Sequence, residues 1–358
     1  IASGWVAQGP RVVRFEQEFA ASVEAPFAVA TTNCTSALHL ALIVVGVGPG
    51  DDVVIPSFSF VATTNAVRYV GANPVFADVD LETGNVTAAT IAAALTPATK
   101  AVIAVDQGGV PVNMGEIRAL TDPLGIVVVE DAACGAGSTF NGRPVGATAE
   151  IAAWSFHPRK LLTTGEGGML TAGRADWAAR ARPLRGPAMS VSAADRHASV
   201  LPAPEVYSEV GYNYRMTDLQ AAVGIVQLGR LPEIVARRRE IAARYQDAVD
   251  GIEGLRAVRD PEHGTGNFQS FWVEVLDGYP TDREGLLEAL AHADISARRG
   301  IMAAHHQPPY RHLVPECGLP NTDRLTDHTL ILPVFHAFTD AQQDRVIAVL
   351  RDPAGAVS

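Results

Sequence analysis

The first two-thirds of the chain alternate short, β-branched apolar runs with alanine-rich stretches of helical character. The runs are apolar on both faces, so the strands they form need cover on both sides. Strands of this kind, separated by helices, are typical of a parallel sheet between two layers of helices, and hence of the α/β class. The expected strands are residues 27–32, 52–58, 74–80, 101–106 and 125–133, and the expected helices are 36–46 and 62–71.

The last third of the chain is predicted to form a second, smaller α/β unit. We place the boundary between a large domain, residues 1–232, and a small C-terminal domain, residues 233–358. Further elements are expected as a strand at 270–276 and helices at 282–290 and 341–350. The segment 186–205 is rich in Ala, Ser and Pro and is expected to be a long loop.

A long helical pattern at 217–249 joins the two predicted units. Thr217 or Asp218 can cap its start. Pro232 lies inside the pattern, and because proline removes a helical hydrogen bond we expect it to break the helix.

Charge and cysteine content exclude several classes of protein. The formal net charge is −11 and there is no basic run, which argues against nucleic-acid or anionic-membrane binding. No apolar run reaches membrane-spanning length, and the first ten residues do not read as a signal peptide. The three cysteines have no metal-like spacing and their number is odd, so we expect neither a zinc site nor a disulfide framework. Free cysteines fit a reducing compartment, and we expect the protein in the cytoplasm. The chain begins without Met, and we expect a short segment before residue 1.

Lysine is used so sparingly that one lysine stands out. Lys100 and Lys160 are the only two, and arginine supplies all other side-chain cations. Lys160 lies in "SFHPRKLLTTGEGG", before a glycine-rich turn that indicates close backbone packing. Desolvation lowers the pKa of a lysine, and its neutral amine can form a Schiff base with an aldehyde, which arginine cannot. An ordinary solvated lysine is the alternative.

Two other features lie where predicted strands end. Glu130 and Asp131 close the run 125–133, and the segment 32–35 leads from a strand into a helix start. Unpaired N–H groups at a helix start suit a phosphate, although simple capping by Thr and Asn is the more frequent role. Asp131 can equally cap a helix or pair with an arginine. An aldehyde-binding lysine, an aspartate and a phosphate site together are what pyridoxal phosphate requires.

Ordered motifs along almost the whole chain resemble the sugar aminotransferases of the DegT/DnrJ/EryC1/StrS family, which have the aspartate aminotransferase-like fold type I of pyridoxal-phosphate enzymes. The resemblance implies a large domain with a mostly parallel seven-stranded sheet between helices, and a smaller C-terminal α/β domain. In chain order the motifs are "SGWVAQGPRVVRFEQEFA", "NCTSALHLAL", "GDDVVIPSFSFVATTNAVRYVGANPVFADVD", "VEDAACGAGSTFNGRPVG", "SFHPRKLLTTGEGGML", "GYNYRMTDLQAAVGIVQL", "HHQPPY" and "LPVFHAFTD".

The resemblance implies roles for the residues around the cofactor ring. Lys160 binds the aldehyde covalently and later shuttles the proton. Asp131 pairs with the pyridinium nitrogen, and Phe60 takes the place of the aromatic that stacks on the ring. Cys134 stands where the family usually has Gln or His over the ring, as a tuned contact or a small apolar filler.

The resemblance also implies a phosphate site and a homodimer in which the two subunits share each active site. Cys34, through its backbone, and Thr35, through backbone and hydroxyl, hold the phosphate together with Ser155. His157 shapes the pocket beside the lysine. Asn213 resembles the asparagine that reaches the phosphate from the partner subunit, so a homodimer with shared active sites is expected.

On the substrate side the resemblance points to four residues. Arg215 is structural or faces substrate, and His305, His306 and Tyr310 lie in the family's substrate-side segment. The adjacent histidines suggest a metal, but no third ligand is suitably spaced, so we expect none.

The implied reaction is a two-stage transamination, with pyridoxamine phosphate as the intermediate form of the cofactor. L-glutamate or L-glutamine is the expected donor and a keto sugar, nucleotide-linked, the expected acceptor, in amino-sugar, antibiotic or other secondary metabolism. The alternatives are a keto-cyclitol acceptor, a pyridoxal-dependent dehydratase, or a catalytically silent scaffold. Family dehydratases have histidine in place of the lysine, so Lys160 argues against that alternative. The replacement of the family's Ser-Gly pair by Asn33-Cys34, and a missing histidine in 105–114, leave the substrate open.

Overall fold

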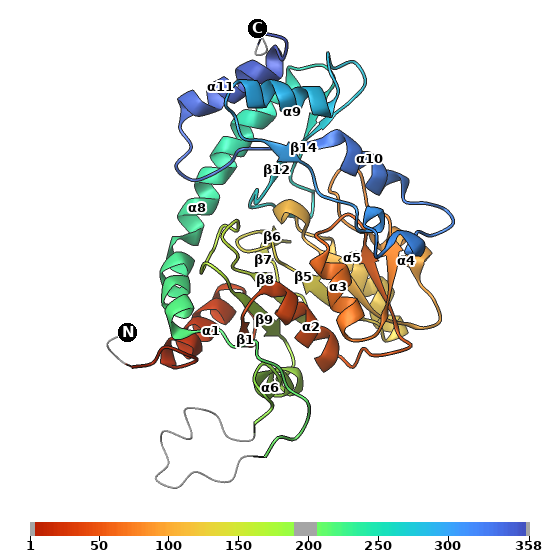
Figure 1. The fold of residues 1–358 in the computed structure, drawn as a ribbon, viewed down its shortest axis with the longest axis vertical. Helices are drawn as coiled ribbons and strands as arrows, with labels where there is room; N and C mark the ends of the chain where they lie inside the picture. Colours follow the sequence, from red (N-terminus) through yellow and green to blue (C-terminus); the bar gives the residue numbers. More distant parts are fainter. Residues whose placement is uncertain (1–3, 190–205, 356–358) are drawn as a thin grey trace.

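The computed structural model of the protein describes residues 4–189 and 206–355, so most of the expected loop at 186–205 lies outside the described residues. A seven-stranded sheet forms its centre, in the order β1-β9-β8-β5-β4-β2-β3 (Figure 1). Only β9 runs against its neighbours; the other pairs in the sheet are parallel. The strands are β1 Phe27–Thr31, β2 Asp52–Pro56, β3 Asn73–Ala77, β4 Thr99–Val105, β5 Val127–Asp131, β8 Ile151–Ser155 and β9 Gly168–Ala172.

Helices cover both faces of this sheet, as the strands' two apolar faces require. The first layer, α2, α3 and α6, packs against one face in a single apolar cluster. Helices α1, α4, α5 and the start of α8 cover the other face. The bounds are α1 Pro10–Ser22, α2 Cys34–Val44, α3 Ala62–Tyr69, α4 Ala88–Ala94, α5 Met114–Thr121, α6 Ala175–Leu184 and α8 Asp218–Asp250. The α/β class and the mostly parallel seven-stranded sheet are confirmed.

A second, antiparallel sheet of order β10-β12-β14-β13 lies beyond the large one, with α9, α10 and α11 around it. One apolar cluster joins Val102 and Ala104 of the large sheet to Phe271 and Leu330 of the small sheet. A three-stranded sheet of order β11-β6-β7 lies beside them. The remaining bounds are β6 Thr139–Phe140, β7 Arg143–Pro144, β10 Leu255–Ala257, β11 Gly264–Thr265, β12 Phe271–Val275, β13 Arg298–Arg299, β14 Thr329–Leu332, α9 Arg283–His292, α10 Pro320–His328 and α11 Asp340–Arg351.

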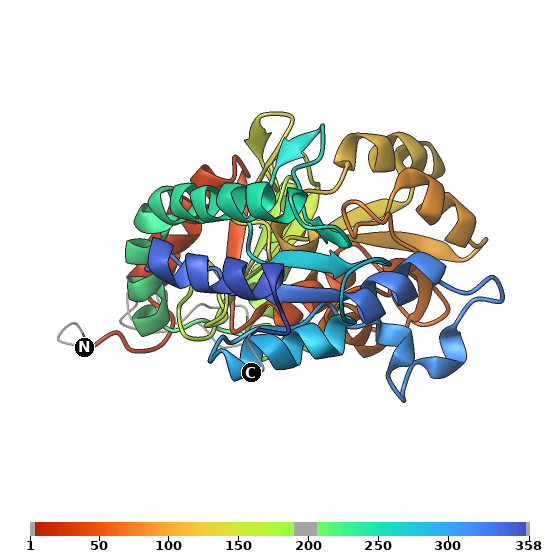
Figure 2. The ribbon, with the colours of Figure 1, turned by 90° about the horizontal axis from the view of Figure 1, so that it is seen from above.

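Helix α8 continues through Pro232, so the expected break there is wrong. It contacts α1 at its start and β10 and α11 further along, and Figure 2 shows α8 and α11 side by side. Leu231 and Ile234 are buried on either side of the proline, and Tyr245 is buried further on. This apolar contact along the helix outweighs one lost hydrogen bond, because tertiary packing supplies most helix stability in proteins. The domain boundary at 232/233 falls inside α8 and stays a prediction.

The two capping candidates at the start of α8 have different tasks. Thr217 is the N-cap, and it forms a reciprocal capping box with Gln220. Asp218 instead serves α1: its carboxylate accepts hydrogen bonds from the N–H groups of Gly9 at 2.9 Å, Val12 at 2.9 Å and Arg11 at 3.1 Å. One buried carboxylate therefore satisfies the free donors of a helix more than 200 positions earlier in the chain.

We expect Asp218→Ala to lower the free energy of unfolding by about 2 kcal/mol, because the N–H groups at the start of α1 lose their acceptor. Chemical denaturation measures the change. Asp247→Ala, an exposed aspartate on the same helix, is the matched control and should leave stability within about 0.5 kcal/mol of the parent chain. Equal effects of the two substitutions would contradict the capping role.

Candidate active site

The candidate site lies at the edge of the large sheet where the parallel strands end. Strands β5 and β8 are neighbours, and they end at Asp131 and Ser155. Helix α2 starts at Cys34, directly after β1 on the other side of β9. The sequence-predicted residues therefore come from several segments that meet at one edge, as ligand sites in open parallel sheets do.

Lys160 lies in the connection between β8 and β9, and its side chain is turned inward. Its Nζ donates to the Sγ of Cys134 at 3.0 Å. Burial by itself lowers the pKa of Lys160, but the Cys134 thiol, followed by Cys34 and Asp131, outweighs burial and the pKa of the free amine is raised. The lowered pKa expected from the sequence is therefore wrong for the free amine. The alternative of an ordinary solvated lysine is wrong, because the amine of Lys160 is hydrogen-bonded inside the protein.

Asp131 is buried at the end of β5 and accepts hydrogen bonds from two donors. Thr63 Oγ1 donates to its Oδ2 at 2.8 Å, and the N–H of Ala133 donates to its Oδ1 at 3.2 Å. Burial raises the pKa of Asp131, while Thr63, Ala133 and Lys160 act in the opposite direction. The Sγ of Cys34 lies 4.0 Å from the same carboxylate. Sequence reasoning missed Thr63; its only signal was a pair of threonines at the start of an expected helix.

Two further acids are buried beside Asp131. Burial raises the pKa of Glu130 to about 7, and burial together with Glu130 raises that of Asp106 well above its usual range. Glu130 Oε2 and Asp106 Oδ2 are inaccessible and have no hydrogen-bond partner among the described residues. Burial disfavours the charged form of each acid, because a charge without a partner is costly to bury. Asp106 was not among the sequence candidates.

The start of α2 is arranged to offer free donors. Asn33 is its N-cap, accepting from Ser36 N at 2.8 Å, and the first intrahelical bond runs from Ala37 N to Asn33 O. The N–H groups of Cys34 and Thr35 precede that bond and stay available. Capping and anion binding are thus not alternatives here, since Asn33 caps while its two successors can bind an anion.

Gly168 brings the lysine segment against this helix start. A Cβ at this position would lie 2.4 Å from the carbonyl carbon of Asn33 and 2.7 Å from the nitrogen of Cys34. No side chain fits in that space, so the glycine-rich turn predicted to pack closely does so, against the backbone that precedes Thr35.

Phe60 lies between β2 and α3, one helical turn before Thr63. Phe60 is 63% exposed, which is unusual for a phenylalanine. A flat aromatic face left open beside a polar site suits a planar ligand ring.

A segment before β12 holds both the lysine and the cysteine in place. Gln269 accepts from Leu161 N at 3.0 Å and donates to Arg159 O at 2.7 Å, so it binds the backbone on both sides of Lys160. Asn267 donates to Cys134 O at 2.7 Å and to Ala136 O at 2.8 Å. Nothing in "NFQS" points to this role, because the contacts join residues more than 100 positions apart.

The other predicted cofactor residues surround this centre. Ser155 Oγ accepts from His157 N at 3.4 Å, and the His157 ring lies against its own turn, with Nδ1 3.2 Å from Arg159 N. Tyr214 O accepts from Thr32 N at 2.8 Å, which places the segment 211–217 beside the entrance to α2.

Of the predicted residues in that segment, Asn213 is exposed and Arg215 is half-buried, next to Gly186.

The other three substrate-side candidates, His305, His306 and Tyr310, lie in a separate group near the end of β2. His305 is buried, with Nδ1 2.7 Å from Ser57 Oγ, and Tyr310 Oη donates to Asn65 Oδ1. The sequence offered no third ligand beside the two histidines, but Asp323 provides one: its Oδ1 lies 2.9 Å from Nε2 of both His305 and His306. The expectation that the two histidines lack a third metal ligand is therefore wrong.

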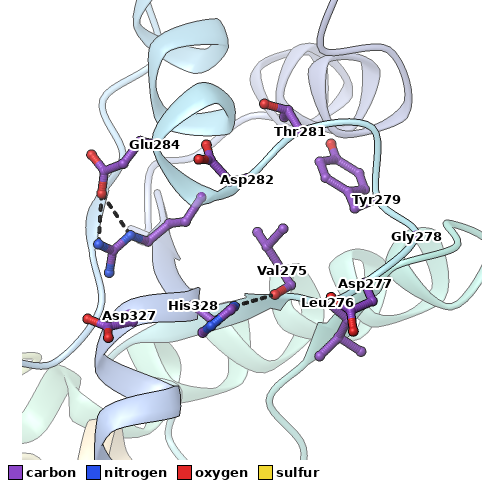
Figure 3. A pocket seen from close by; sticks show the side chains of 11 residues that line it. Val275, Leu276, Asp277, Gly278, Tyr279, Thr281, Asp282, Glu284, Asp327 and His328 are labelled. Carbon is purple, nitrogen blue, oxygen red and sulfur yellow. Dashed lines mark hydrogen bonds and ion pairs between the residues drawn. The ribbon is translucent and has the colours of Figure 1, made fainter.

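A cavity of about 430 Å³ lies elsewhere, beside the small sheet (Figure 3). It is framed by the end of β12, the start of α9 and the end of α10, with an ion pair between Arg283 and Glu284 and a hydrogen bond between His328 and Val275 O. None of the predicted site residues lines it, so it is not part of the site around Lys160. In the described part of the chain, no helix is both long and apolar enough to span a membrane.

Comparison with known proteins places this geometry in context. The model of the DegT/DnrJ/EryC1/StrS aminotransferase family matches residues 1–351. The spore coat polysaccharide biosynthesis protein SpsC of Bacillus subtilis is 38% identical over 98% of this chain and 92% of its own length. The aminotransferase TlmJ of Streptoalloteichus hindustanus has a TM-score of 0.90 at 36% identity, covering 99% of this chain and 94% of that one. DesI, solved in the presence of its TDP-sugar product, has a TM-score of 0.89 at 32% identity, with 99% and 88% covered.

The raised pKa of Glu130 predicts how the stability of the fold depends on pH. Its ordinary pKa of 4.5 is raised to about 7 in the folded chain, so the unfolded chain loses this proton first as pH rises. Folding is therefore penalised progressively between pH 4.5 and 7, and by a constant amount above that range. We expect Glu130→Gln to remove up to about 3 kcal/mol of this penalty at pH 8 and little at pH 4.5.

Denaturation curves across this pH range measure the difference between the variant and the parent chain. Glu116→Gln, at an exposed glutamate, is the control and should run parallel to the parent. A parallel curve for Glu130→Gln would show that Glu130 ionises normally in the folded state.

Proposed function

The chain belongs to the DegT/DnrJ/EryC1/StrS aminotransferase family, and from this premise we propose that it moves the amino group of L-glutamate or L-glutamine to a nucleotide-linked keto sugar. The chain is a pyridoxal-phosphate-dependent sugar aminotransferase. The observation that carries the residue assignment is the inward-facing amine of Lys160 beside the buried carboxylate of Asp131. An exposed lysine and an aspartate with no buried partner would not support this chemistry.

The residues at this edge of the sheet fit the cofactor. Lys160 would bind its aldehyde, Asp131 its ring nitrogen, and the free N–H groups of Cys34 and Thr35 its phosphate, with Ser155 beside them. When bound, pyridoxal phosphate supplies an aldehyde that condenses with amines and a ring that takes up the electron pair of a neighbouring carbon.

Three side chains complete the proposed cofactor site. Phe60 offers an exposed aromatic face for the ring, and Cys134 adds a small, polarizable side chain near the amine. His157 shapes the turn that carries Lys160. The Cys134 side chain is smaller than the Gln or His usual in the family, so it leaves more room beside Lys160.

Lys160 would also carry the proton transfers. Once a substrate amine has taken its place, the free Nζ can remove the proton from the donor's α-carbon as a general base. In the second half-reaction the same nitrogen returns a proton to the sugar carbon that receives the amino group. Gln269 bonds the backbone on both sides of Lys160, so the base stays positioned while it acts.

Asp131 must stay negatively charged to keep a ring nitrogen protonated. Its burial works against this, and the hydrogen bonds from Thr63 and Ala133 work for it.

The nucleotide-linked acceptor is supported by the relatives. DesI was solved with a TDP-sugar product, and SpsC is a polysaccharide biosynthesis protein. We propose Arg215, His305, His306 and Tyr310 for the substrate side, in amino-sugar, antibiotic or other secondary metabolism, with a keto-cyclitol as the alternative acceptor. A cytoplasmic location stays a prediction.

A homodimer with shared sites is part of the proposal. Leu219, Val223 and Val226 form an exposed apolar stripe along the first turns of α8, at helical spacing. Tyr69 and Phe60 are also exposed. An exposed apolar surface of this kind next to the site suits a second copy of the chain, whose Asn213 would reach the phosphate.

Replacing each lysine in turn tests the central assignment. After borohydride reduction, the parent chain and Lys100→Ala should carry one cofactor label on the peptide containing Lys160, measured by mass spectrometry. Lys160→Ala should carry none and should lose amino transfer to every member of a panel of nucleotide-linked keto sugars and keto-cyclitols. Label or turnover in Lys160→Ala would refute the assignment. Turnover by the parent with keto-cyclitols alone would refute the acceptor.

Thr63 and Thr64 offer a matched pair for the role of Asp131. Both are buried neighbours in α3, but only Thr63 donates to Asp131; Thr64 Oγ1 has no hydrogen-bond partner among the described residues. We expect Thr63→Val to raise the pKa of Asp131, move the acidic limb of the pH–rate profile to higher pH and lower kcat about tenfold. Thr64→Val should change neither. Identical profiles for the two variants would rule out the positioning role of Thr63.

A further inference from the structure

A compact group of metal-binding side chains lies between the short helix Ala304–His306 and α10. The Nε2 atoms of His305 and His306 each lie 2.9 Å from Asp323 Oδ1. One ligand atom from each residue lies within 4.8 Å of the others. A tetrahedral zinc site with bonds of about 2.1 Å separates its ligands by roughly 3.4 Å, so small side-chain rotations suffice to form one.

The carboxylate oxygen at the centre of this group lacks a hydrogen bond. Asp323 Oδ1 is inaccessible to solvent and has no hydrogen-bond partner among the described residues, although two ring nitrogens lie so close to it. Leaving a buried carboxylate oxygen without a donor is costly. A bound cation would compensate its charge and use the lone pairs of both rings.

The surroundings prepare His305 to act as a ligand. Its Nδ1 lies 2.7 Å from Ser57 Oγ, which also accepts from His305 N at 3.0 Å. When Nδ1–H donates to Ser57, Nε2 presents its lone pair towards Asp323, and this outer hydrogen bond is typical of metal-bound histidine.

The Asp323 carboxylate is also held in position. Asp323 lies in the first turn of α10, and that turn is tied to Asp78 at the end of β3. Asp78 accepts from Asn321 N at 3.0 Å, and from Thr322 N and Thr322 Oγ1, each at 2.8 Å. The two protein segments that bring the three ligands together are therefore anchored to the same edge of the large sheet.

We propose that His305, His306 and Asp323 bind one divalent transition-metal ion of the zinc class. Two imidazoles and one carboxylate suit zinc, cobalt or copper better than magnesium or calcium, which prefer oxygen ligands. His306 is exposed, so a fourth position is open to water or to a ligand. The ion would tie the segment carrying Tyr310 to α10, and the site does not depend on the bound cofactor.

Cobalt(II) titration of the full chain, loaded with cofactor, treated with chelator and free of any histidine tag, tests the site. We expect one equivalent to bind, with visible bands typical of low coordination number, and zinc to displace it. His306→Ala should weaken binding at least tenfold. Because His306 is exposed, that variant should keep the parent melting temperature in the absence of metal.

Two further variants complete the test. Asp323→Asn should also weaken cobalt binding at least tenfold. His312→Ala, at an exposed histidine six positions further along, should bind cobalt like the parent. Failure of the parent chain to bind close to one equivalent, parent-like binding by His306→Ala, or an equal loss in His312→Ala would each overturn the proposal. None of these outcomes depends on aminotransferase activity.

Discussion

The pairing of β8 with two neighbours is the constraint on which the site depends. On one side β8 runs parallel to β5, with Ala153 opposite Asp131. On the other side it runs antiparallel to β9, with Ser155 opposite Gly168. The connection that contains Lys160 therefore leaves the sheet from the neighbour of the strand that ends in Asp131, and it returns as β9 on the other side of β8. A slip of one residue would turn every side chain of β8 to the other face and move this connection relative to Asp131.

Side-chain contacts from distant segments turn this placement into a working geometry. Gln269 and Asn267 reach from the segment before β12 to the backbone around Lys160 and Cys134. Thr63, on α3, supplies the bond that favours the charged form of Asp131. These contacts fix the reacting groups through neutral hydrogen bonds. Burial raises the pKa of the two neighbouring acids, that of Glu130 to about 7 and that of Asp106 well above its usual range.

The parts of the site that the sequence predicted are those with a local signal. Apolar runs with β-branched residues located β1 to β5, and the scarcity of lysine pointed to Lys160 without any structure. Asp131 could be named because it follows a buried run. The lowered pKa of Lys160 was a wrong expectation, since it counted burial and not the acidic neighbours that folding brings to the amine. The break at Pro232 was wrong for a similar reason, because local propensity was judged without the packing on either side.

The sequence by itself determined the class of fold and the chemical identity of the central lysine and aspartate, because periodicity and composition are properties of neighbouring residues. Only the tertiary structure decided that Thr63 holds Asp131, that Asp218 caps α1, and that Asp323 joins His305 and His306. Each of these contacts links residues from separate elements, and its existence depends on which strand lies next to which. Side-chain spacing along the chain carries no information about such distances until the sheet order brings the elements together.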